Sequence, residues 1–152
     1  MFCTLKLPLS ISLQLKLHSD ALLEVSRMPK NTDFDSTFTQ LKEIFAPYVD
    51  KLNVAADTPD NYALETHHVL KNKHRLYFGG VRRGKAYVSF HLMPVYTCPE
   101  MTEKISPDLK KRMQGKSCFN FKAPDEKLFN ELRKLTKAGF TRFTSKKFES
   151  PF

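Results

Sequence analysis

The stretch LYFGGVRRGKAYVSFHLMPVY, residues 76–96, decides the fold that we expect for this 152-residue chain. Its two ends are rich in β-branched and aromatic residues, and a short basic segment with Gly84 separates them. Two such runs joined by a short loop are typical of a β-hairpin, and Gly84 allows the positive φ that such loops often need. The pair Gly79–Gly80 predicts a bulge, or a close approach of another group, in the first strand.

The second strand of this hairpin has two different faces. Val88, Phe90 and Leu92 alternate with Ser89 and His91. A period of two places alternate side chains on opposite faces of a strand. We therefore expect one apolar face, buried beneath helices, and one mixed polar face.

Further segments on both sides of the hairpin have the patterns of regular structure. Apolar residues recur at three- and four-residue steps from Asp35 to Leu52, which predicts a helix with Asp35 or Ser36 as its N-cap and a kink or an end at Pro47. Residues 53–61 carry turn residues, and Thr58–Asn61 is the expected loop. The other expected segments are a strand at 62–70, a loop at 97–105, a helix from Ser106 to Gly115, a strand at 117–122 and a helix from Pro124 that ends before Gly139.

The order of these segments is helix, strand, strand, strand, helix, strand, helix. It predicts an α+β fold, with a small antiparallel sheet of about four strands and helices covering one face. The length and the 41% hydrophobic content indicate one domain with a core of its own. With 13 Phe, 5 Tyr and no Trp, that core is expected to be aromatic.

Residues 1–27 are expected to form an N-terminal extension. Leucine or isoleucine occupies every second position from Leu5 to Leu17. The segment is either disordered or an added edge strand, and the pattern leaves both alternatives open. It resembles neither a signal peptide nor a membrane span. We expect the domain itself at residues 28–143 and a basic tail at 144–152.

The charge of the chain favours acidic partners. The formal net charge is +9, so an acidic protein or a nucleic acid is a candidate partner. Three cysteines without a CxxC pair argue against a disulfide framework and indicate a reducing, cytoplasmic location. The candidate residues for a polyanion site are Arg82, Arg83, Lys85, Lys110, Lys111, Arg112 and Lys116.

A set of polar residues is expected to share the mixed face of the sheet. Neighbouring strands bring alternate residues together on an open face, and titratable groups gathered in this way often bind a ligand. The alternative is a solvated face whose side chains satisfy one another. The candidate ligand-binding residues are Glu65, His67, Tyr87, Ser89, His91, Cys118 and Asn120.

No motif commits the chain to a reaction. Ser89 lacks the GxSxG context of a nucleophile elbow, Gly79 belongs to no phosphate-binding loop, and no zinc-binding spacing of His and Cys occurs. Cys118 lies near Lys116, which favours a thiolate, but no base can be assigned to it. A partly buried thiol is the interpretation that we favour. We therefore expect binding and assign no catalytic residue.

Four strings in the chain resemble a bacterial family of domains of unknown function, the YdhG-like proteins. They are Asp57–Pro59, Tyr77–Val81, Tyr87–Tyr96 and Arg112–Phe121. The resemblance extends from about Phe34 to Phe143 and implies a compact α+β domain. It brings no catalytic residues with it, because the family has no agreed catalytic motif.

One branch of this family is similar in shape to frataxin, and the resemblance therefore implies an iron chaperone as one candidate function. Iron held at a surface by oxygen ligands needs a local group of carboxylates. The first helix offers mainly Glu43 and Asp50, and the chain is basic, so both arguments disfavour iron. We rank first a small binding or chaperone-like domain that uses the open sheet face or the loops around Gly79 and Pro94, then iron, then a polyanion.

Overall fold

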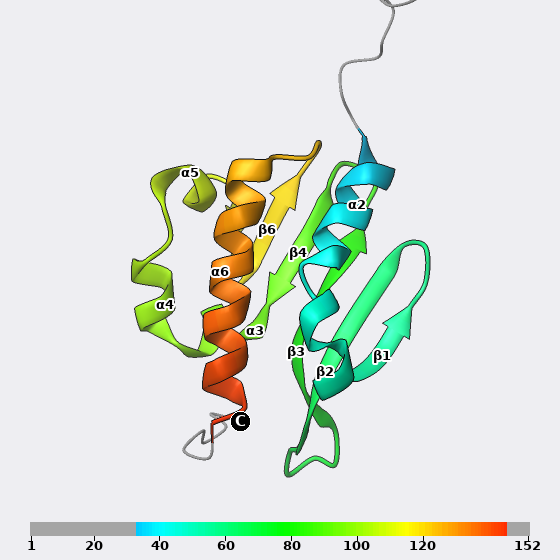
Figure 1. Cartoon of the computed structure of the whole chain (residues 1–152), viewed down its shortest axis with the longest axis vertical. Helices are drawn as coiled ribbons and strands as arrows, with labels where there is room; N and C mark the ends of the chain where they lie inside the picture. Colours follow the sequence, from blue (N-terminus) through cyan, green and yellow to red (C-terminus); the bar gives the residue numbers. More distant parts are fainter. Residues whose placement is uncertain (1–32, 146–152) are drawn as a thin grey trace, which may run out of the picture. The chain divides into compact units, whose positions relative to one another are not determined.

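The computed structural model of the protein describes residues 33–145 (Figure 1). In this part of the chain, helices lie on one face of an antiparallel sheet of six strands. The α+β fold is confirmed, whereas the expected strand number and element order are wrong. The predicted extension at residues 1–27 and most of the predicted tail, residues 146–152, lie outside the described residues.

The helices are α2 (Phe34–Glu43), the 3-10 helix η1 (Ala46–Lys51), α3 (Met93–Thr97), α4 (Pro99–Glu103), α5 (Pro107–Lys110) and α6 (Glu126–Phe143). The strands are β1 (Asn53–Asp57), β2 (Asn61–Val69), β3 (Arg75–Arg83), β4 (Val88–Leu92), β5 (Met113–Gln114) and β6 (Cys118–Phe121). Their order across the sheet is β1-β2-β3-β4-β6-β5. The first four strands thus form a meander, and α3 to α5 connect β4 to the other edge of the sheet.

The predicted hairpin is confirmed as β3 and β4, which pair antiparallel. Val88, Phe90 and Leu92 have no exposed surface, because α2 and α6 cover that face of the sheet (Figure 1). The ring of Phe45 stacks on Phe90 with centroids 4.8 Å apart. The core is aromatic, as predicted, and its fully buried phenylalanines are Phe45, Phe78, Phe90, Phe119, Phe121 and Phe129.

The predicted bulge is present in β3. Leu64 of β2 pairs with Gly79. The next residue of β2, Glu65, pairs with Tyr77, so Phe78 between them has no partner. One extra residue on one strand of an antiparallel pair is the definition of a β-bulge.

This bulge decides which side chains of β3 face the helices. Phe78 and Val81 are both buried in the core, and a Cβ on Gly79 would lie 3.0 Å from a core phenylalanine ring. Without the extra residue, the period of two would turn one of these positions away. Residues an odd number of steps apart on an uninterrupted strand point to opposite faces. Because of the bulge, Tyr77 and Arg82 both lie on the face opposite the helices.

The helix predicted for residues 35–52 is two helices, so the predicted kink or end at Pro47 is confirmed as an interruption. α2 ends at Glu43, and Pro47 lies in the first turn of η1. Proline has no N–H to donate, so it is tolerated there but interrupts a continuous helix. The N-cap of α2 is Asp33, whose side chain accepts a hydrogen bond from the Ser36 N–H at 3.0 Å.

Two segments without a predicted helix or strand contain regular structure. The loop expected at Thr58–Asn61 is confirmed, since the Thr58 N–H donates to the Asn61 carbonyl oxygen at 2.9 Å, but the residues before it form β1, an edge strand whose residues are mostly exposed and therefore lack an apolar alternation. Residues 97–105 include α4, a helix of five residues that starts with Pro99, directly after α3. Strand β5 has two residues, too few for a sequence pattern.

Two glycines do not end helices as predicted. Gly115 lies between β5 and β6 with a φ of 69°, beyond the end of α5 at Lys110. Gly139 lies inside α6, which continues to Phe143. A Cβ on Gly139 would lie 2.7 Å from the Cβ of Pro94, so this glycine lets α6 approach α3.

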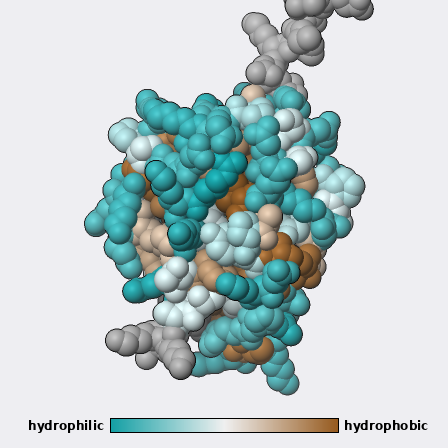
Figure 2. All heavy atoms as spheres, in the orientation of Figure 1, coloured by the Kyte–Doolittle hydropathy of each residue, from teal (hydrophilic) through white to brown (hydrophobic). Residues whose placement is uncertain are grey.

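The outer surface of the helical side is mostly hydrophilic, with small hydrophobic patches between the polar side chains (Figure 2). In residues 33–145, no helix has both the length and the apolar character that a membrane span requires.

Candidate functional site

The face of the sheet opposite the helices carries polar side chains of β4 and β6. Ser89, His91, Cys118 and Asn120 are all partly exposed. The strand register pairs Ser89 with Asn120 and His91 with Cys118. These predicted site residues therefore lie side by side on one face.

On one half of this face, the polar side chains form hydrogen bonds with one another. The Ser89 hydroxyl donates to Oδ1 of Asn120 at 2.6 Å, and Nδ2 of Asn120 donates to Oε1 of Gln114 at 2.8 Å. The Tyr87 hydroxyl donates to the same Gln114 oxygen at 3.1 Å. We call these four residues the amide ladder. Because these side chains mainly use one another as hydrogen-bond partners, this half of the face is better explained as a solvated surface than as a ligand site.

The other half of the face contains a thiol beside an imidazole. Sγ of Cys118 lies 3.2 Å from Nδ1 of His91. Burial raises the pKa of the Cys118 thiol, and a hydrogen bond with Ser117 offsets part of this rise. Burial and the nearby charge of Arg82 lower the pKa of His91. Both groups are therefore uncharged at neutral pH, which makes Cys118 a poor nucleophile.

A hollow of about 200 Å³ lies beside His91 on the same face. Tyr77, Arg82 and His91 line it together with Asn61, and Ala63 and Gly80 add little bulk. We call it the His91 hollow. A Cβ on Gly80 would lie 2.8 Å from the Tyr77 hydroxyl oxygen, so the absence of a side chain there leaves room for this hydroxyl.

The Tyr77 hydroxyl has no hydrogen-bond acceptor in the part of the chain that the structure describes. Burial, and secondarily the proximity of Cys118, raise the pKa of Tyr77, so the phenol keeps its proton. Within residues 33–145 this hydroxyl makes no hydrogen bond, yet no buried side-chain oxygen or nitrogen there lacks a partner. The hydroxyl is therefore accessible from the hollow.

Arg82 and Arg83 have different environments because neighbouring residues of a strand point to opposite faces. Arg83 forms ion pairs with Asp35 and, at 4.0 Å, with Asp60. Arg82 is exposed and forms no ion pair with any carboxylate in residues 33–145. Among the described residues, the hollow thus has a guanidinium without a carboxylate partner at its rim.

Two of the predicted site residues lie away from this hollow. Glu65 pairs with Tyr77 in the strand register but does not line the hollow. His67 is exposed near the end of β2, where its Nδ1 lies 3.4 Å from a guanidinium nitrogen of Arg75. The predicted seven-residue surface is therefore divided between the amide ladder, the Cys118–His91 pair and these two separate residues.

Two residues of this face, Tyr77 and Gln114, are not among the predicted site residues. Tyr77 alternates with two apolar neighbours, and this signal places it opposite the core. Gln114 belongs to the two-residue strand β5 and gave no such signal. Arg82 was predicted only as a polyanion contact.

The candidate polyanion residues do not form one set. Arg82 and Arg83 point to opposite faces of β3. Lys111 forms an ion pair with Asp108 at 3.2 Å, whereas Lys110 and Lys116 line a separate pocket. These basic residues therefore lie in at least three different environments.

The carboxylates considered for iron do not meet. Glu43 in α2 and Asp50 in η1 are both exposed. Across the described part of the chain, no three side chains of His, Cys, Asp or Glu lie close enough to hold a metal ion together. The iron hypothesis therefore has no ligand set within residues 33–145.

No family model, curated protein or solved structure shows a significant match to this chain. The candidate site consequently stands on its own geometry: a hollow on the open face of the sheet, lined by Tyr77, Arg82 and His91.

Proposed function

We propose that this domain binds a small oxyanion group, a carboxylate, sulfate or phosphate, in the His91 hollow. The observation that supports this proposal most is the gathering of Tyr77, Arg82 and His91 around one hollow of about 200 Å³. The Arg82 guanidinium has no carboxylate partner within residues 33–145, which favours an anion, and hydrogen bonds to charged groups are the strong ones.

The hydrogen bond between Cys118 and His91 supports the same ligand class. The thiol keeps its proton, because burial raises its pKa, and a neutral imidazole accepts at one ring nitrogen and donates at the other. When the thiol donates to Nδ1 across 3.2 Å, the ring proton is assigned to Nε2. His91 then offers the ligand a donor, as do Arg82 and the Tyr77 hydroxyl.

The broader expectations stay predictions beside this proposal. These are membership in the YdhG-like family, a chaperone-like role and a cytoplasmic location. A polyanion is a weaker candidate, because the basic residues predicted for it lie in separate environments, and Lys111 is already paired with Asp108. The small hollow favours a single anionic group over an extended polymer.

Arg82→Gln tests the proposal with sulfate as the probe. Sulfate keeps its charge throughout the neutral range, and chloride maintains the ionic strength. In a titration followed by amide NMR shifts, we expect saturable shifts at Gly80, Arg82 and His91. Arg82→Gln is expected to weaken sulfate binding about tenfold or more, because a charge-assisted hydrogen bond contributes about 1.5–3 kcal/mol.

Lys85→Gln is the matched control for this variant. Lys85 is exposed in the loop between β3 and β4, so its removal changes the net charge by the same amount without altering the hollow. Sulfate affinity within about twofold of the unmodified protein is expected for Lys85→Gln. Equal weakening by the two variants would instead indicate nonspecific attraction to a basic surface, and the proposal would fail.

A further inference from the structure

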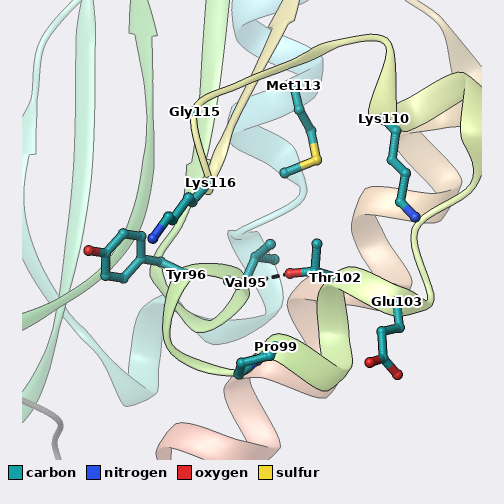
Figure 3. A pocket seen from close by; sticks show the side chains of 9 residues that line it. All are labelled: Val95, Tyr96, Pro99, Thr102, Glu103, Lys110, Met113, Gly115 and Lys116. Carbon is teal, nitrogen blue, oxygen red and sulfur yellow. Dashed lines mark hydrogen bonds between the residues drawn. The ribbon is translucent and has the colours of Figure 1, made fainter.

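A second and larger pocket lies between the helical connection and the β5–β6 turn (Figure 3). Its volume is about 510 Å³, within the range of small-molecule sites. Val95 and Pro99 come from α3 and α4, and Met113 comes from β5. These three side chains make the interior apolar. We call it the α4 pocket.

The rim of the α4 pocket is charged. Lys110 and Lys116 line it together with Glu103. Lys116 and Tyr96 lie at one side, and Lys110 and Glu103 lie at the other, as Figure 3 shows. Two ammonium groups and one carboxylate leave a net charge of +1 around an apolar interior.

These two lysines have no carboxylate partner in the described residues. Neither Lys110 nor Lys116 forms an ion pair within residues 33–145, whereas Lys111 and Lys127 both pair with Asp108. The ammonium of Lys116 lies 5.4 Å from the centroid of the Tyr96 ring. This cation–π contact holds the charge beside the pocket without neutralising it.

The walls of the α4 pocket are fixed by the fold. Val95 is almost fully buried, with 1% of its surface exposed, and Met113 packs against the core. The Thr102 hydroxyl donates to the carbonyl oxygen of Val95 at 3.3 Å, which ties α4 to α3. A ligand would therefore meet a preformed apolar floor.

We propose that the α4 pocket binds a small amphiphilic monoanion, an aliphatic or aromatic carboxylate whose apolar body lies on Val95, Pro99 and Met113. Its carboxylate lies beside the ammonium group of Lys116, at the side of the pocket away from Glu103 (Figure 3). A bare ion would leave the apolar floor in contact with water, and a neutral hydrocarbon would leave both lysines unpaired. The net charge of +1 around the pocket is complementary to a single negative charge.

Octanoate and octan-1-ol test this inference, because they share an apolar chain and differ in charge. Binding is followed below the micellar range by amide and methionine-methyl NMR shifts. The Met113 methyl signal is expected to move with octanoate, while those of Met93 and Met101 move less. Octanoate is expected to bind at least about fivefold more tightly than octan-1-ol.

The variants separate the two lysines of the rim from their neighbour. Lys116→Gln is expected to weaken octanoate binding about fivefold and to leave octan-1-ol binding unchanged. Lys110→Gln is expected to weaken octanoate binding less, because Lys110 lies at the opposite side of the pocket, together with Glu103. Lys111→Gln is the matched control, because Lys111 is exposed, belongs to the same segment and does not line the pocket. Octanoate affinity within about twofold of the unmodified protein is expected for it.

Met113→Glu supplies an independent test by placing a carboxylate on the floor. It is expected to abolish octanoate binding through repulsion of like charges. Three results would overturn the inference: no octanoate binding, equal affinity for octanoate and octan-1-ol, or equal effects of Lys111→Gln and Lys116→Gln. Arg82→Gln should leave octanoate binding intact, so the proposals for the α4 pocket and for the His91 hollow are tested independently.

Discussion

At the scale of single residues, His91 is partly buried and also lines the hollow on the open face of the sheet. Its imidazole is desolvated enough for its pKa to be lowered, yet it lines a hollow that is open to ligand. The groups around it are Arg82, Cys118 and Tyr77. None of these three residues carries a carboxylate, which would favour the protonated ring at neutral pH.

The lowered pKa of His91 makes stability depend on pH in the acidic range. An unfolded histidine titrates near 6.5, so between the lowered folded pKa and about pH 6.5 the unfolded chain binds more protons. The contribution of His91 to stability is therefore complete above about pH 6.5 and is lost as the pH falls through the folded pKa. We expect His91→Gln to reduce the loss of unfolding free energy between pH 7 and pH 5.

Urea unfolding at a series of pH values measures this effect, and His74→Gln is its control. The His74 side chain is exposed in the turn between β2 and β3, so that variant should keep the pH dependence of the unmodified protein. An identical acid destabilisation in His91→Gln and in the unmodified protein would show that His91 is not desolvated.

At the scale of elements, two glycines allow the contacts that place the site and the helices. Gly79 belongs to the bulge that sets Tyr77 and Arg82 on one face of β3. Gly139 lies inside α6, where its missing side chain accommodates Pro94 of α3. A glycine near a possible helix end looks like a C-cap in the sequence, and only the packing of α6 on α3 distinguishes the two roles.

Gly139→Ala tests the packing role against helix propensity. Alanine stabilises a helix interior by about 1 kcal/mol relative to glycine, but its Cβ would lie 2.7 Å from Pro94 Cβ. Overpacking of this kind costs about 1–3 kcal/mol. We expect Gly139→Ala to lower the unfolding free energy, measured by denaturant titration, despite the gain in propensity.

A second substitution in α6 measures the effect of helix propensity on stability without a close contact. Ala138 is exposed in α6, and Ala138→Gly should cost about 1 kcal/mol through propensity alone. If Gly139→Ala stabilised the protein by a similar amount, the close contact between α6 and α3 would be absent.

At the scale of the whole molecule, the sequence pattern predicts the centre of the sheet and fails at its edges. The alternation of Val88, Phe90 and Leu92 identifies the buried face of β4 because that strand has one apolar and one polar side. The edge strand β1 is mostly exposed and shows no such alternation. The short elements α3, α4 and β5 are set by contacts that are distant in sequence.

The candidate site, too, was predictable only in part. Strand alternation places Ser89, His91, Cys118 and Asn120 on one face, and the structure confirms this. It does not reveal that Asn120 is satisfied by Ser89 and Gln114, or that the bulge brings Tyr77 and Arg82 beside His91. Hydrogen-bond partners and bulges depend on the register between strands, which the pattern of a single strand does not contain.

The most direct test of an oxyanion site beside His91 is the pKa of its imidazole, measured by NMR in sulfate and in chloride at equal ionic strength. A bound anion stabilises the imidazolium, so sulfate should raise the pKa of His91. His67, His68 and His74 are exposed and serve as internal controls for a general effect of sulfate. If sulfate raised the pKa of His91 no more than that of these three histidines, the hollow would not be an anion site.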